Sequence, residues 1–247
     1  MRTVRIHIPS PLASGAACTL PSEAGDHVAR VLRLKAGATL NVFDGQGGEH
    51  AAVIETVRGG EVSVRLGERL DPARESPLSV TLAQGLSRGG RMDYAIQKAV
   101  ELGVGAIQPL ATQRSVVRLD ERKAKNRLAH WQHVAISACE QSGRNFVPEV
   151  SALRDLNEWL GELDAEAGPR FVLDPGARIG LASRPPPTAQ DVTMLVGPEG
   201  GLCDSELALT EQHGFVRVRL GPRVLRTETA AVAALTALQT LWGDLAS

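Results

Sequence analysis

The first seventy residues show the short alternations of apolar and polar side chains that are typical of β-strands. Val4, Ile6 and Ile8 alternate with Arg5 and His7, which predicts a strand with one buried face. Three further strands, joined by glycine-rich turns, are expected over residues 39–43, 49–57 and 61–66. Short strands separated by tight glycine turns indicate a small β-barrel at the N-terminus.

A short helix is expected between the first two of these strands, with Val28, Val31 and Leu32 on one face. The polar segment 71–77 contains two prolines and is interpreted as a linker. We therefore expect two domains, a barrel over residues 1–72 and a second domain over residues 73–247.

From Leu78 onward the pattern changes to apolar runs of strand length alternating with longer stretches of helical periodicity. Strands are predicted over residues 78–84, 106–110, 170–173, 192–196 and 216–220. Helices are predicted over residues 93–102, 120–141, 154–163, 204–213 and 227–242. This alternation is typical of an α/β domain with a mainly parallel sheet.

The composition, 43% hydrophobic and 22% charged residues, is that of a globular chain and excludes disordered and collagen-like classes. No apolar run approaches the roughly 18 residues of a membrane span, and residues 1–5 lack the apolar centre of a signal peptide. Cys18, Cys139 and Cys203 lie far apart, which argues against structural zinc or disulfides and for a reducing cytoplasm. The six histidines show no metal-ligand spacing, so no metal is expected.

Charge is distributed unevenly along the chain although the formal net charge is only −1. Residues 76–150 carry 10 basic and 6 acidic side chains, whereas residues 151–247 carry 8 and 13. A basic middle segment suggests a polyanionic partner such as RNA, and a solvated helix face explains it equally well. Aromatic residues make up only 3% of the chain, so RNA contacts would depend on arginine rather than on base stacking.

Two loops follow predicted strands and have the composition of ligand-binding loops. One is Gly197-Pro198-Glu199-Gly200-Gly201, which leads into a helix that Asp204 is expected to cap. The other runs from Gly221 to Thr229 and leads into the last helix. Open parallel sheets bind ligands at the carboxyl ends of their strands, and glycine lets the backbone approach a ligand closely. A single Gly-Pro is more often only a turn, whereas two such loops favour a pocket.

Several common sites are absent from the sequence: a P-loop, a Rossmann fingerprint and a nucleophile elbow. The segment 137–145 at the end of the longest predicted helix is a further polar cluster. Glu140 and Arg144 there form either an ordinary i,i+4 helix-end pair or a polar group directed at a substrate.

Taken together, the ordered motifs resemble the bacterial small-subunit (16S) ribosomal RNA uracil-N3 methyltransferase family, of the SPOUT class. The motifs that carry the resemblance are HVARVLR at 27–33, residues 84–91 with 96–104, CEQSGRN at 139–145, GPEGGL at 197–202 and LGPRVLRTETA at 220–230. They span essentially the whole chain, and the last two are the most specific.

The resemblance implies a PUA-like RNA-binding barrel, a SPOUT domain with a trefoil knot, and a homodimer that acts on 16S rRNA or the small ribosomal subunit. The alanines at 230, 231, 233, 234 and 237 would allow close helix approach in such a dimer, and burial inside the monomer is equally plausible. It also implies S-adenosylmethionine bound by loops around residues 173–175, 195–201 and 220–226. The expected cofactor-binding residues are Leu173, Leu195, Gly197, Glu199, Gly200, Gly201, Leu220, Gly221 and Leu225.

Methylation at N3 requires loss of the weakly acidic N3 proton, which a carboxylate can accept while an arginine stabilises the anion. The residues expected around the base are Arg226, Glu228, Glu140 and Arg144, and which of them is the base stays open. The expected phosphate contacts are Arg88, Arg91, Arg114, Arg122, Lys123 and Lys125.

Two positions depart from the family pattern. Relatives often have histidine or another polar residue at Asp174, and glutamate at Gln113. Two alternatives to the uracil-N3 activity are the same fold acting on another RNA position and a non-enzymatic RNA-binding assembly factor.

Overall fold

The computed structural model describes residues 3–115, 121–164 and 168–246. The chain forms two compact units, one of residues 1–75 and 139–147 and the other of residues 76–138 and 148–247. The described part of the chain contains no helix with the length and hydrophobicity to cross a bilayer. The predicted helix 120–141 begins at a residue outside the described ranges, and its described part is helical from Glu121.

Unit 1 is built on a five-stranded sheet with the order β1-β3-β4-β5-β2. Its elements are β1 (Arg5–His7), β2 (Ala17–Thr19), α1 (Ser22–Asp26), a π-helical turn (His27–Val31), β3 (Thr39–Phe43), β4 (Glu49–Arg58) and β5 (Glu61–Leu70). β1 pairs with β3 in parallel, and the other neighbours are antiparallel. The predicted strands and glycine turns of this unit are confirmed.

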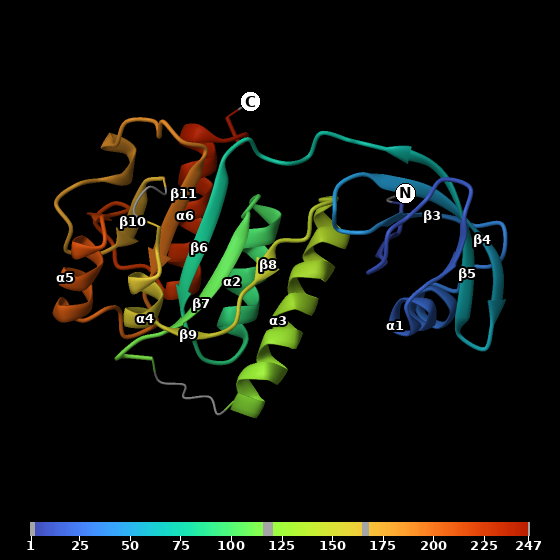
Figure 1. Ribbon diagram of the computed structural model, residues 1–247, viewed down its shortest axis with the longest axis horizontal. Coiled ribbons are helices and arrows are strands. Elements are labelled where there is room, and N and C mark those ends of the chain that lie inside the picture. Colours follow the sequence, from blue (N-terminus) through green and yellow to red (C-terminus); the bar gives the residue numbers. More distant parts are fainter. Residues whose placement is uncertain (1–2, 116–120, 165–167, 247) are drawn as a thin grey trace. The chain divides into compact units, whose positions relative to one another are not determined.

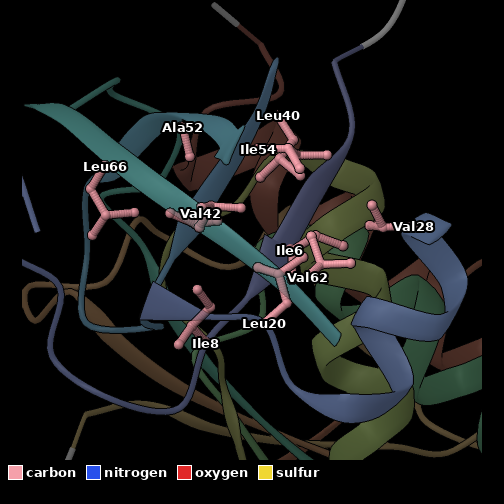
Figure 2. Close-up of a cluster of buried hydrophobic side chains, with 11 residues drawn as sticks. Ile6, Ile8, Leu20, Val28, Leu40, Val42, Ala52, Ile54, Val62 and Leu66 are labelled. Carbon is pink, nitrogen blue, oxygen red and sulfur yellow. The ribbon is translucent and has the colours of Figure 1, made fainter. Parts of the chain in front are cut away.

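One apolar cluster forms the core of unit 1 (Figure 2). Alternate residues of the long strands point into it, among them Val42, Ile54 and Val62. Val28 joins them from the π-helical turn and is fully buried. The prediction that Val31 and Leu32 share this buried face is wrong: they are 66% and 37% exposed, whereas Ala29 and Leu34 pack against the core beside Val28.

The second face of β1 is also covered, by residues 139–147 of the same unit. Arg5, which alternation places on a solvated face, is buried and donates to Glu49, to the Arg144 carbonyl (3.0 Å) and to Asn145 Oδ1 (2.6 Å). The His7 N–H donates to Glu140 (3.0 Å). The prediction of a half-solvated first strand is therefore wrong, because a segment distant in sequence packs on it.

Unit 2 contains a sheet with the order β12-β10-β11-β6-β7-β8, and β9 also pairs with β7 (Figure 1). Every pairing in it is parallel. Its strands are β6 (Ser79–Gly85), β7 (Ala106–Ala111), β8 (Glu149–Val150), β9 (Arg154–Asp155), β10 (Arg170–Leu173), β11 (Asp191–Val196) and β12 (Phe215–Val218). The predicted α/β class with a parallel sheet is confirmed.

The helical elements of the rest of the chain are α2 (Gly90–Glu101), α3 (Glu121–Ser142), α4 (Leu156–Gly161), a 3-10 turn (Leu181–Ser183), α5 (Asp204–Gln212) and α6 (Thr227–Trp242). α4 and α5 cover one side of the sheet, where Trp159 packs on Phe215 with ring centroids 6.1 Å apart. α6 packs against α2, β6 and β11. Helices on the sheet bury the apolar strands, which explains why these strands show apolar runs rather than alternation.

One predicted helix begins later in the structure, and another has a different cap. The helix expected from residue 154 begins at Leu156, because Arg154 and Asp155 pair with β7 as β9. The Asp155 carboxylate then caps α4 by accepting from the Asn157 N–H (2.8 Å). The cap of α5 is Cys203 rather than Asp204, and Glu206 accepts from the Cys203 N–H (2.9 Å).

We expect Arg5→Met to lower the free energy of unfolding by about 3–5 kcal/mol, because it leaves the buried Glu49 carboxylate without its main partner. Urea unfolding of the full chain measures this. The matched control is Arg65→Met, which removes an exposed pair to Glu55 (2.6 Å) and should cost less than about 1 kcal/mol. Equal losses for the two variants would contradict a buried role for Arg5.

Candidate functional site

A pocket of about 570 Å³ lies in unit 2 at the carboxyl ends of three neighbouring strands. Its walls are the loops that follow β10, β11 and β12, over residues 173–175, 196–202 and 218–228. Arg91 of α2, Arg114 after β7, Leu207 of α5 and Ala230 of α6 complete the lining. The volume lies within the roughly 300–1,000 Å³ of small-molecule sites, and the place is the one where open parallel sheets bind ligands.

The loop after β11 is fixed by a buried polar chain. Thr227, the first residue of α6, donates its hydroxyl hydrogen to the Gly197 carbonyl (2.7 Å). The same hydroxyl accepts from the side-chain amide of Gln84 (2.9 Å), which also donates to the Gly85 carbonyl (3.0 Å). Gln84 and Thr227 are both buried, so one hydroxyl joins β6, this loop and α6.

Glu199 fixes the middle of the same loop against the start of α2. Its Oε1 accepts from the Arg88 N–H (2.9 Å) and from the Arg91 guanidinium (2.8 Å). Burial raises the pKa of the Glu199 carboxyl, but these hydrogen bonds and the Arg91 charge outweigh it and hold the pKa below its ordinary value. Glu199 therefore stays ionised at neutral pH.

The far end of the loop is tied to the segment after β7. Arg114 donates to the carbonyls of Gly200 (3.1 Å) and Leu202 (3.4 Å). Glu206, which is buried, accepts from the backbone N–H groups of Gln113 (2.8 Å) and Cys203 (2.9 Å). Two backbone segments thus share one carboxylate.

The loop after β10 is held through Asp174. Its Oδ2 accepts from Nε (2.9 Å) and Nη2 (2.6 Å) of Arg217 on β12, and its Oδ1 accepts from the Gly176 N–H (2.9 Å). Asp174 is buried and lines the pocket. A charged pair therefore connects the end of β10 with β12.

Three glycines, Gly85, Gly200 and Gly201, contribute to this arrangement. A Cβ on Gly85 would lie 2.5 Å from the Pro198 nitrogen, so the loop can cross the end of β6 only at a glycine. Gly201 has φ +67°, which favours glycine, whereas Gly197 and Gly200 show no positive φ. A Cβ on Gly200 would approach Arg114 at 3.0 Å, so its glycine is needed for packing against Arg114.

Eight of the nine expected cofactor-binding residues line the pocket: Leu173, Gly197, Glu199, Gly200, Gly201, Leu220, Gly221 and Leu225. Leu195 is not among the lining residues. It is a β11 side chain that is 1% exposed and packs in the core under α4 and α5.

The four residues expected around the base fall into two groups. Arg226 and Glu228 line the pocket, Arg226 as the N-cap of α6 and Glu228 in its first turn. Glu140 and Arg144 belong to unit 1. There Arg144 pairs with Glu75 (2.6 Å), and Glu140 accepts from the His7 N–H (3.0 Å).

Cys139 begins the unit 1 segment and is buried. Burial raises the pKa of its thiol to about 12. The thiol is therefore protonated at neutral pH, and Cys139 has no nucleophilic character.

The six residues expected to contact phosphates lie in two places. Arg91 and Arg114 line the pocket, and Arg88 is exposed beside it, with its N–H on Glu199. Arg122, Lys123 and Lys125 are exposed in the first turns of α3.

The sequence patterns do not identify three parts of the site: Gln84, Glu206 and the Thr227 hydroxyl. Their signal is a polar residue at the end of an apolar strand or within the first turn of a helix. Polar residues are also common at strand ends and helix starts that face solvent. Only the buried contacts therefore distinguish these three residues from ordinary surface residues.

With this geometry in place, comparison with known proteins identifies the class. Residues 74–239 match the family described as "RNA methyltransferase domain", and residues 20–67 match "RNA methyltransferase PUA domain". The chain therefore has the fold of an RNA methyltransferase with a PUA domain.

Individual relatives narrow the class to one family. The ribosomal RNA small subunit methyltransferase E of Bacillus subtilis is 34% identical, over 89% of this chain and 88% of its own. The protein of that name from Neisseria gonorrhoeae, solved bound to S-adenosyl methionine, is 38% identical with a TM-score of 0.92, covering 99% of this chain and all of its own. A Legionella pneumophila protein solved with the cofactor SAM is 42% identical with a TM-score of 0.94 and the same coverage. The chain belongs to the ribosomal RNA small subunit methyltransferase E family.

We expect Thr227→Val to lower the free energy of unfolding by about 1–3 kcal/mol, because the Gly197 carbonyl and the Gln84 amide lose their buried partner. Backbone amides of residues 197–201 should also exchange with solvent faster. Hydrogen exchange with mass spectrometry measures both the loop and the whole unit. Thr227→Ser keeps the hydroxyl and is the control; a matching loss in that variant would contradict the role of the hydroxyl.

Proposed function

We propose that this chain transfers a methyl group from S-adenosylmethionine to N3 of a uridine in 16S rRNA of the small ribosomal subunit. The observation that carries the proposal is the pocket at the ends of β10, β11 and β12 in a chain of this family. Family membership supports the rRNA substrate, and the sequence resemblance supports the N3 position.

The residues of the pocket fit such a methyl donor. Leu173, Leu202, Leu220 and Leu225 give apolar surface, and the glycines expose backbone donors and acceptors to an adenosine moiety. The ionised Glu199 supplies negative charge near a cationic donor. Bound in this pocket, S-adenosylmethionine supplies a methyl group that its positively charged sulfur already activates.

The chain then has to present the base and help it lose a proton. N3 lies on the Watson–Crick edge, so the target uridine must be unpaired or extruded from its helix. As the N3 proton leaves, negative charge spreads to the two flanking carbonyl oxygens. A fixed cation near these oxygens stabilises the transition state more than the bound substrate.

Arg226 is the cation that we assign to this task. It is exposed, lines the pocket and caps the start of α6, where the helix dipole also favours an anion. Glu228, two residues later, forms its ion pair with Arg91 (3.7 Å), which supports a role for Arg226 beyond fixing the loop.

RNA binding is assigned to unit 1 as a module and to basic side chains of unit 2. The PUA family match supports unit 1 as an RNA-binding module. The exposed residues Arg88, Arg122, Lys123 and Lys125, with Arg114 at the pocket, are proposed phosphate contacts in unit 2. Glu140 and Arg144 belong to unit 1, and no role in the chemistry at the pocket is proposed for them.

The active form is proposed to be a cytoplasmic homodimer. Ala231 and Ala234 are buried within unit 2, so burial inside the monomer accounts for them. Ala230, Ala233 and Ala237 remain partly exposed along one side of α6. These three alanines support close approach of a helix from a second copy of the chain. Analytical ultracentrifugation of the full chain tests whether it is a dimer.

Incubation with methyl-labelled S-adenosylmethionine and unmodified small ribosomal subunits, followed by digestion to nucleosides, tests the activity. We expect the label in 3-methyluridine. Label in a ribose-methylated nucleoside or in methylguanosine would support another RNA position instead. An unlabelled product with intact RNA binding would support a non-enzymatic factor.

Arg226→Ala should lower the single-turnover methylation rate about 100-fold or more, since an oxyanion-stabilising donor acts mainly in the transition state. Donor affinity, measured by calorimetry, should change little. If Arg226 only fixes the loop, donor binding and thermal stability would fall together with the rate.

A further inference from the structure

Three carboxylates line the pocket, and they differ in how their oxygens are used. Asp174 is engaged through both oxygens, by Arg217 and by the Gly176 N–H. Glu199 Oε1 accepts two hydrogen bonds. Glu228 is different: its Oε2 is buried and has no hydrogen-bond donor within the described ranges. Since a buried acceptor without a donor costs free energy, this oxygen favours the arrival of an N–H or O–H group.

Arg91 is the side chain that holds Glu228. Its Nη1 donates to Glu199 (2.8 Å), and its Nε lies 3.7 Å from Glu228 Oε1, an ion pair longer than a hydrogen bond. Glu199 is itself fixed by the Arg88 N–H. One guanidinium at the start of α2 therefore connects the loop after β11 with the first turn of α6.

Two further features describe the surroundings of Glu228. It lies in the first turn of α6, where the helix dipole favours negative charge. Its side chain is only 16% exposed, so the positive charge of Arg91 is screened less than at a solvated surface. The terminal torsion of a glutamate is broad, so a turn of the carboxylate brings either oxygen to the pocket side.

We propose that Glu228 accepts the N3 proton of the substrate uridine and that Arg91 is its positioning residue. This assignment rests on the proposed methyltransferase function. The N3–H bond breaks and its proton passes to the Glu228 carboxylate. The N3 electron pair forms the new bond to the methyl carbon, while the carbon–sulfur bond breaks and leaves its pair on the sulfur, which becomes neutral. The Glu228 carboxyl then releases the proton to water.

The proposal gives Arg91 a different role from the phosphate contact that the sequence suggested. Two of its nitrogens face carboxylates of its own unit, and its side chain is 42% exposed. A phosphate contact would instead require these nitrogens to leave Glu199 and Glu228. The two roles make opposite predictions for the coupling between Arg91 and Glu228.

The experiment is a double-mutant cycle on the full chain with saturating donor and unmodified small subunits as substrate. Glu228→Gln keeps the shape of the side chain and should lower the single-turnover rate about 100-fold or more. Arg91→Gln should lower it about tenfold, and the double variant should be no slower than Glu228→Gln alone. Donor affinity by calorimetry should stay within about twofold in Glu228→Gln. Arg91→Gln also releases Glu199 of the loop after β11, so the rates of the two variants that lack Arg91 are compared at saturating donor.

The matched control is Arg88→Gln, which keeps the backbone N–H that reaches Glu199. Its effect should multiply with that of Glu228→Gln, because its side chain does not act through that carboxylate. For RNA binding, Arg91→Gln should leave the salt dependence of the affinity unchanged. A slope reduced by about one, with multiplicative effects on the rate, would make Arg91 a phosphate contact and overturn its positioning role.

A second variant separates proton transfer from structure. Glu228→Ala should regain part of its rate when formate is added, because the small carboxylate can occupy the vacated space and accept the proton. A Glu228→Gln chain that forms 3-methyluridine at the normal rate would overturn the assignment of Glu228 alone. A wild-type chain that forms no 3-methyluridine would overturn the proposed function.

Discussion

The loop after β11 has almost no side chains that could fix its conformation. The shape of the pocket therefore depends on contacts that other segments make with this loop. Three of its five residues are glycines and one is proline. Its position is therefore imposed by neighbours: the Thr227 hydroxyl at Gly197, the Arg91 guanidinium at Glu199 and the Arg114 guanidinium at Gly200. Each contact leaves part of the loop backbone available to a ligand, which a loop packed by its own side chains could not offer.

The same solution recurs at the other walls of the pocket. Asp174 and Arg217 connect the ends of β10 and β12, and Glu206 connects residues 113 and 203. The polar groups are paired within a sheet whose strands are otherwise apolar. Buried polar pairs of this kind fix the relative position of loops because any other arrangement leaves a charge or an amide unsatisfied.

Much of unit 2 could be predicted because its elements carry strong local signals. The predicted strand 170–173 and helix 227–242 coincide with β10 and α6. The short strands β2, β8 and β9 are not among the predicted elements, because no alternation extends beyond their two or three residues as it does around β1. The pocket loops were found by composition and resemblance, whereas their anchors were not, since burial of Gln84 or Glu206 depends on distant segments.

The environment of two charged residues could not be predicted from the sequence around them. Arg5 alternates with apolar residues as a solvated side chain would, yet it is buried because residues 139–147 pack on it. Arg91 was predicted to face RNA because it is a basic residue in a basic segment, yet its nitrogens face two carboxylates. A charge pattern gives only the number and the spacing of charged residues, whereas the role of each charge depends on the partner that the fold supplies.

Unit 1 is discontinuous in sequence, and this has a consequence for how the protein is made. Its first 75 residues contain all five strands, but the segment that covers β1 arrives only at residues 139–147. During synthesis from the N-terminus, the contact of Arg5 with Asn145 can therefore form only after more than half of the chain has been produced. The N-terminal unit is the first to begin folding, but it can be completed only after the chain has passed through β6, β7 and α3.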